Sequence, residues 1–148
     1  MRILVSGDRN YSDRGIVQAV LDGIHRDWYQ RNFPSSMDKE FVVIEGEAPG
    51  VDTIARQCAE RLDLSVEPYP ARWAEHDYEG HSGVTCYHKP DPTRCPAAGP
   101  RRNQQMLDEG RPDVVVCFHD NIEASRGTKD MLTRAKDAGI PVYVISRH

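Results

Sequence analysis

Short apolar runs without polar alternation recur along the chain at intervals. Four of them are rich in β-branched residues: Arg2–Ser6, Phe41–Glu45, Asp113–Phe118 and Val142–Ile145. Such runs are typical of strands that are buried on both faces of a parallel sheet. A fifth run, Ser65–Tyr69, contains a proline that cannot donate to a strand ladder. We therefore expect this fifth strand at an edge of the sheet.

Between these runs, apolar residues recur every three or four positions, which is the spacing of amphipathic helices. The three stripes are Val17, Val20, Leu21, Ile24 and Trp28; Ile54, Ala55, Cys58 and Leu62; and Met131, Leu132, Ala135 and Ala138. This alternation predicts an α/β fold, a Rossmann-like three-layer sandwich around a five-stranded, mainly parallel sheet. The edge strand favours the order 3-2-1-4-5. Ligands of such sheets bind beyond the carboxyl ends of the strands, where the strand order reverses.

One segment, residues 74–98, interrupts this pattern and is rich in Gly, Pro, His and Cys. A connection of this length without periodicity is usually functional. The chain has 148 residues, which fits a single domain, 1–148, that carries this segment as an insert.

Composition and charge exclude several classes of function. The chain has 19 Lys and Arg against 23 Asp and Glu, a net charge of −4, so nucleic acid is not an expected partner on charge alone. No apolar run approaches the roughly 20 residues of a membrane span, and the amino terminus turns polar too early for a signal peptide. We expect a cytoplasmic protein that does not contact a membrane.

Two of the loops at the carboxyl edge of the predicted sheet follow its first two strands. In the first loop, Gly7 permits close approach of a ligand and Arg9 can bind phosphate through two hydrogen bonds. The alternative is an ordinary turn with a solvated arginine. The second loop has two glycines that leave N–H groups free for an anion, although its aspartate is also suited to cap the next helix. The candidate ligand-binding residues in these loops are Ser6, Gly7, Arg9, Gly46, Gly50 and Asp52.

Two further loops open helices at the same edge. Pro100 suits the first position of a helix, which would put Arg101 and Arg102 in the first turn. A cation there is disfavoured by about 0.3–1 kcal/mol unless an anion is near, so the pair favours a phosphate site over two solvated charges. In Ser125–Thr128, Thr128 can cap the last helix, with or without a phosphate on Gly127. The candidate ligand-binding residues here are Arg102, Asn103, Gly127 and Thr128.

Several of these motifs together resemble a known family. The segments Ser6–Tyr11, Gly46–Asp52, Ala98–Asn103 and Gly127–Thr128, with Trp73 among them, resemble in order and spacing the YspA-type branch of the SLOG superfamily, a distant relative of LOG and DprA proteins. The resemblance covers nearly the whole chain except the insert. It implies a Rossmann-like fold that binds a nucleotide or nucleotide-derived small molecule, as a sensor or sequestering protein. It also implies a homodimer and a phage or bacterial source.

The chain departs from this pattern where LOG enzymes carry Gly-Gly-x-Gly-Thr-x-x-Glu. Ala124 and Ser125 replace the first two glycines, and Met131 replaces the catalytic glutamate. A thioether cannot exchange a proton, and Asp130 would point about 100° around the helix. Whether the protein is an enzyme is therefore left open, and binding without strong chemistry is the leading interpretation. The alternative is a LOG-type nucleotide phosphoribohydrolase, and a second is a single-stranded nucleic-acid binding module like DprA.

The insert concentrates residues that bind metals. They are His76, His81, Cys86, His88 and Cys95. Thiolate and imidazole are natural ligands of tetrahedral zinc, and a loop without a core benefits from one. We predict that His81, Cys86, His88 and Cys95 bind a structural zinc ion, although their spacing is not that of a standard zinc finger. The alternatives are a disulfide between the two cysteines or free surface residues. No redox cofactor is expected, and Cys58 and Cys117 are predicted core thiols.

Overall fold

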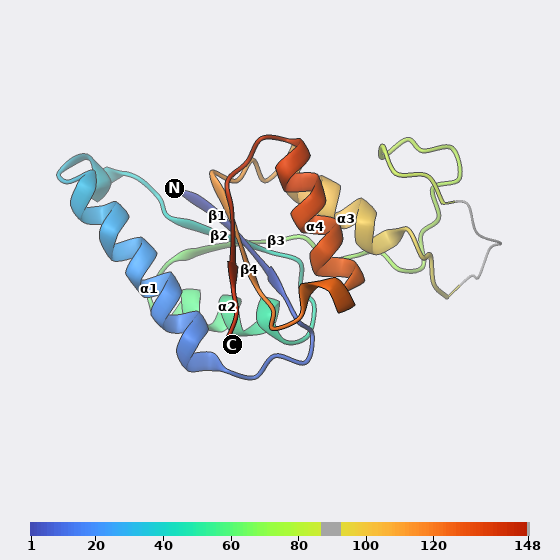
Figure 1. Cartoon of the computed structure of the whole chain (residues 1–148). Coiled ribbons are helices and arrows are strands. Elements are labelled where there is room, and N and C mark those ends of the chain that lie inside the picture. The colour runs from blue at the N-terminus through green and yellow to red at the C-terminus, as the bar shows by residue number, and fades with distance from the viewer. Residues whose placement is uncertain (87–92, 148) are drawn as a thin grey trace.

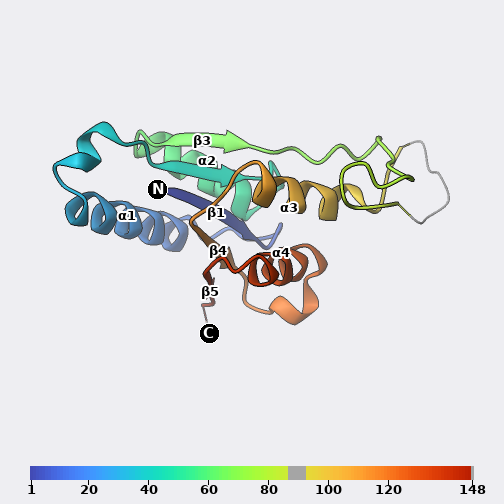
Figure 2. The same ribbon diagram turned by 90° about the horizontal axis from the view of Figure 1, so that it is seen from above.

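The chain folds around a five-stranded parallel sheet. The computed structural model describes residues 1–86 and 93–147. The strands are β1 (Arg2–Gly7), β2 (Val42–Glu45), β3 (Ser65–Pro68), β4 (Val114–Phe118) and β5 (Val142–Ile145). They lie in the order β3-β2-β1-β4-β5, and every neighbouring pair is parallel (Figure 2). The predicted fold class and strand order are confirmed, including the proline-containing strand at the edge.

Helices cover both faces of the sheet. One face carries α1 (Arg14–Arg31) and α2 (Val51–Arg61), and the other carries α3 (Ala98–Asp108) and α4 (Arg126–Asp137) (Figure 1). Two short 3-10 helices, η1 (Ser35–Asp38) and η2 (Ile122–Ala124), belong to the connections. None of the helices in the described part of the chain is both long and apolar enough to cross a membrane.

Two apolar cores lie on opposite faces of the sheet because successive strand residues point to opposite sides. Val43 of β2 packs with Val17 and Leu21 of α1 in one core. Ile44, the next residue of β2, packs with Met106 of α3 and Met131 of α4 in the other. The three-layer sandwich follows from this division.

The last strand differs from its prediction. The sequence of Val142–Ile145 predicts a strand that is buried on both faces. In the structure, however, Tyr143 is 60% exposed and Val144 is 46% exposed. The reason is topological: β5 ends the strand order and pairs with β4 on one side only. A β-branched run therefore serves here as an edge strand.

The described residues of the insert extend beyond the amino-terminal end of α3 and away from the sheet (Figures 1 and 2). These residues form turns and bends until α3 begins at Ala98. They also form a small apolar cluster in which Cys86 and Cys95 pack with Ala97 and Ala98. This is a minor core compared with the two that flank the sheet.

Candidate functional site

The loops after β1 and β2 are joined at the carboxyl edge of the sheet. The carbonyl oxygen of Asp8 accepts hydrogen bonds from the backbone N–H groups of Tyr11 (3.1 Å) and Val51 (3.2 Å). Gly50 has a φ of +79°, and a Cβ on it would lie 2.3 Å from the same oxygen. Only glycine allows this contact, so the first two predicted loops meet at this point.

Asp52 organises the loop after β2 from within. Its side chain is 5% exposed and accepts from the N–H groups of Gly46 (3.0 Å) and Ala48 (3.3 Å). The residue that caps α2 is Gly50, with no side-chain hydrogen bond, so Asp52 does not have the capping role considered from the sequence. Burial raises the pKa of Asp52 to about 6, against the opposing effects of Arg102 and the two N–H groups.

Arg102 connects α3 to this loop. Its Nη1 donates to the carbonyl oxygen of Gly46 at 2.5 Å, and its Nε donates to Oδ1 of Asn103 at 3.1 Å. Burial lowers the pKa of Arg102, and the carboxylates of Asp52, Glu45 and Asp130 act against this shift. Two nitrogen atoms of the Arg102 guanidinium are therefore engaged by neutral acceptors of the protein itself.

This arrangement corrects the argument from the helix dipole. Helix α3 begins at Ala98, so Pro100 occupies its third position rather than its first. The N–H of Arg101 already donates to the carbonyl of Ala97 at 2.9 Å. Neither arginine therefore requires a bound anion to explain its position, since Arg101 also donates to the carbonyl of Glu75.

Asn103 ties the start of α4 into the same network. Its Nδ2 donates to the carbonyl oxygen of Gly127 (3.2 Å) and to Oδ2 of Asp130 (3.0 Å). The cap of α4 is Ser125, whose Oγ accepts from the N–H of Thr128 at 3.1 Å. The predicted cap, Thr128, is instead buried. All four predicted loops thus lie within one connected set of contacts.

Glu45 is a member of this cluster that the sequence analysis does not single out. It is fully buried at the end of β2, where one carboxylate oxygen accepts from the N–H of Glu47 at 2.5 Å. The other oxygen has no hydrogen-bond partner in the described part of the chain. Burial raises its pKa to about 7, with a further contribution from Asp52. Glu45 could have been identified from the sequence, because it is a carboxylate at the last position of an otherwise apolar strand.

The other predicted ligand-binding residues divide into buried and exposed groups. Ser6 and Gly7 are half-buried at the end of β1, and a Cβ on Gly7 would lie 2.3 Å from the carbonyl oxygen of Phe118. Arg9 is exposed and has no ion-pair partner among residues 1–86 and 93–147. Gly127 is also exposed, with open space where a side chain would be. The exposed members are thus those at the tips of the first and fourth loops.

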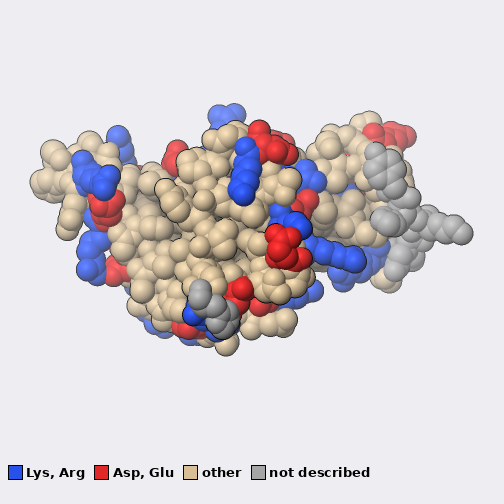
Figure 3. Space-filling model, viewed as in Figure 1, with Lys and Arg blue, Asp and Glu red and all other residues tan. Residues whose placement is uncertain are grey.

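Two hollows border the network. A cleft of about 590 Å³ lies between the segment after β3 and α3, and its lining includes Arg102, Arg101 and His76. A second hollow of about 380 Å³ is lined by Gly50 and by residues at the starts of α1 and α2. On the face shown in Figure 3, charges of both signs occur in small groups among uncharged residues. This face offers no continuous basic surface.

The residue at the position of the LOG glutamate, Met131, is not accessible to a ligand in this structure. Met131 is fully buried in the core between the sheet, α3 and α4. Asp130 accepts from Nε of Arg134 at 2.9 Å and from Asn103. Its carboxylate is therefore engaged by one side chain of its own helix and by one of α3.

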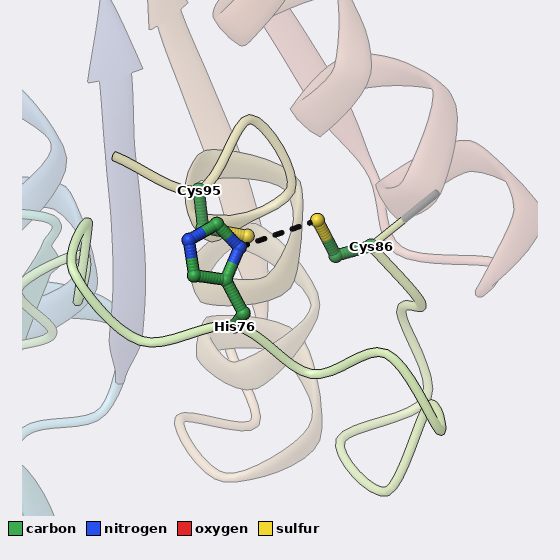
Figure 4. Close-up of side chains that lie close together, drawn as sticks. All are labelled: His76, Cys86 and Cys95. Carbon is green, nitrogen blue, oxygen red and sulfur yellow. Dashed lines mark hydrogen bonds between the residues drawn. The ribbon is translucent and has the colours of Figure 1, made fainter. Parts of the chain in front are cut away.

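The insert brings three metal-binding side chains together (Figure 4). The potential ligand atoms of His76, Cys86 and Cys95 all lie within 4.8 Å of one another, so this group could hold a metal ion. Two of the four predicted ligands, both cysteines, belong to it. His81 does not, because its Nε2 lies 2.6 Å from a carboxylate oxygen of Glu79, and His88 lies outside the described residues.

All four cysteines are buried and none forms a disulfide. Cys58 and Cys117 belong to the two main cores, as predicted. Burial raises the pKa of both thiols, that of Cys117 to about 12. Cys86 and Cys95 are therefore distinguished from them by the nearby imidazole rather than by burial.

The fold and the joined loops define a Rossmann-like α/β protein with its candidate site at the carboxyl edge of the sheet. The chain belongs to the YspA, cpYpsA-related SLOG family, whose model matches residues 1–76. A comparison with curated protein sequences gives no match. The fold is similar to that of DNA processing protein A (DprA) from Streptococcus pneumoniae, with a TM-score of 0.67 and 19% identity. The match covers 99% of this chain and 50% of the DprA chain, so this chain spans half the length of that protein.

Proposed function

We propose that the protein binds a nucleotide or nucleotide-derived small molecule and acts as a sensor or sequestering protein. The observation that carries this proposal is the single network joining the loops beyond β1, β2 and β4. It lies where the strand order reverses, the usual ligand position in such sheets. Membership of a SLOG family supports a nucleotide-related ligand.

The exposed members of the network are the proposed contacts for the anionic group of the ligand. Arg9 is exposed and has no ion-pair partner in the described part of the chain, and Gly127 leaves the amino terminus of α4 open. A helix amino terminus with free N–H groups favours phosphate or carboxylate. Arg102, whose Nη1 and Nε are engaged, borders the cleft with its remaining N–H donors. Asp52 and Asn103 hold the loops in place.

Replacing Arg9 by alanine should weaken binding without affecting folding. A charged hydrogen bond contributes about 1.5–3 kcal/mol, so we expect a loss of roughly tenfold or more in affinity. The measurement is calorimetric titration with a panel of nucleoside monophosphates and diphosphates. Arg31→Ala is the matched control, because Arg31 is exposed at the far end of α1. Equal affinities for both variants and the unaltered protein would remove Arg9 from the site.

Two further assays of the purified protein test the other two functions, the phosphoribohydrolase and the nucleic-acid binding module. Release of free base from a nucleoside monophosphate would establish a phosphoribohydrolase instead of a binding protein. Retention on single-stranded DNA that falls steeply with salt would establish the nucleic-acid module. The homodimer implied by the family resemblance stays a prediction.

We also propose that the insert holds a structural zinc ion. The described residues of the insert before α3 lack helix and strand, and their apolar cluster is small. Such a segment gains stability from an ion that cross-links it, and thiolate with imidazole suits zinc. Elemental analysis of the purified protein should find one zinc per chain. A protein that folds and carries no zinc after supplementation would contradict this part of the proposal.

A further inference from the structure

We propose that His76, Cys86 and Cys95 are three of the ligands of this ion and that the ion holds the insert against α3 as one wall of the cleft. This inference rests on the proposed structural zinc. It differs from the ligand set predicted by sequence spacing, which names His81 and His88 beside the two cysteines and omits His76. The two sets make different predictions for single substitutions.

The geometry of the three side chains favours a shared ion. Ligands 2.0–2.3 Å from tetrahedral zinc lie about 3.3–3.8 Å apart. The three ligand atoms are already within 4.8 Å of one another, and Sγ of Cys86 lies 3.5 Å from Nδ1 of His76. An ion between them therefore requires side-chain movements of about 1 Å or less.

Apolar packing alone does not explain this group. Buried cysteines often serve as small hydrophobic residues, as Cys58 does in the main core. The cluster around Cys86 and Cys95 differs because a polar imidazole is directed at the sulfur atoms (Figure 4). The ring of His76 is also stacked on that of Tyr78, with the ring centroids 5.2 Å apart.

His81 lies in a different environment within the same insert. Its ring is exposed and paired with Glu79, and its backbone N–H donates to Asp77 at 2.9 Å. It therefore belongs to a turn organised by the Asp77 carboxylate, which also accepts from the N–H of Ser82 at 2.7 Å. This makes His81 a matched control for His76.

Arg101 links the proposed metal centre to the cleft. Its Nη1 lies 3.8 Å from Sγ of Cys95, and its Nη2 donates to the carbonyl oxygen of Glu75, the residue before His76. Arg101 and His76 both line the cleft of about 590 Å³ that Arg102 also borders. Arg101 is thus a positioning residue that braces two ligand-bearing segments on α3. Loading of the ion should order the cleft wall that these segments form.

Cobalt substitution tests the ligand set directly. Metal-free protein is titrated with Co²⁺, and the thiolate-to-cobalt absorption band is recorded for the unaltered protein, His76→Ala and His81→Ala. We expect tight binding of one equivalent by the unaltered protein and by His81→Ala, and at least a tenfold loss of affinity for His76→Ala. His76→Cys should restore binding with a stronger thiolate band, and circular dichroism verifies that each variant folds.

The possible outcomes separate this inference from the zinc proposal. Absence of any cobalt or zinc binding by the unaltered protein would overturn the zinc proposal itself. Binding that is lost in His81→Ala but retained in His76→Ala would leave the zinc and overturn the ligand set. Binding retained in both variants would also overturn the ligand set, because it would exclude His76.

Amide hydrogen exchange tests the second half of the inference. Adding Zn²⁺ to metal-free protein should slow exchange in residues 72–82 and in the first turns of α3, in both the unaltered protein and His81→Ala. His76→Ala should show little change at the same zinc concentration. Exchange that is unaffected by zinc in the unaltered protein, despite stoichiometric binding, would show that the ion does not order the cleft wall.

Discussion

Asp52→Ala is expected to lower the free energy of unfolding by about 2–4 kcal/mol, because two N–H groups of the loop would lose the acceptor that satisfies them in the folded protein. The substitution deprives the N–H groups of Gly46 and Ala48 of the Asp52 carboxylate. Urea denaturation followed by circular dichroism measures the loss. The loop after β2 should be the first segment to lose order.

Two comparisons make this expectation specific. Asp108→Ala removes an exposed carboxylate on α3 that accepts from Gln104, and it should change stability by no more than about 0.5 kcal/mol. Asp52→Asn keeps an amide oxygen that can accept from these N–H groups, so it should lose less stability than Asp52→Ala. A change below about 1 kcal/mol for Asp52→Ala would show that these hydrogen bonds do not hold the loop together.

Glu45→Gln should change how stability depends on pH. Burial raises the pKa of Glu45 from 4.5 to about 7, so the folded protein binds this proton more tightly than the unfolded chain does. The resulting stability is fully present below about pH 4.5 and is lost as pH rises to about 7. The loss is on the order of 3 kcal/mol, since one pKa unit corresponds to about 1.4 kcal/mol. Glutamine does not titrate, so the variant should keep more of its stability at pH 8.

The measurement is the free energy of unfolding from pH 4 to pH 8 for both proteins. Asp52 has a pKa raised to about 6 for the same reason, so a smaller decline should persist in Glu45→Gln. Glu60→Gln, at an exposed position of α2, is the control and should follow the unaltered protein. Parallel curves for Glu45→Gln and the unaltered protein would contradict the assignment of the buried acid.

The fold could be predicted because its determinants are local. β-branched runs mark strands buried in a parallel sheet, and apolar residues at helical spacing mark the covering helices. Pro68 placed β3 at one edge of the sheet. The exposure of Tyr143 could not be read in the same way, since an edge strand and a central strand can share a β-branched sequence.

The candidate site was predicted in outline but not in its internal contacts. Glycines after the strands indicated where the loops would meet, and Gly50 does lie against the first loop. The carboxylates that act on Arg102 belong to β2, α2 and α4, so no local pattern in the sequence reveals them. In the insert, both cysteines were identified, but without periodicity the spacing cannot indicate which histidine faces them.

The proposed function requires that an anionic ligand bind at the carboxyl edge of the sheet. Chemical-shift mapping of the ¹⁵N-labelled protein during titration with nucleoside monophosphates and diphosphates tests this directly. We predict that the largest shifts fall on the amides of Gly7–Asn10, Gly46–Ala48, Gly50 and Gly127, with little change at Arg111 on the opposite edge. Shifts confined to the opposite edge, or no shifts at millimolar concentrations of any member of the panel, would contradict the account.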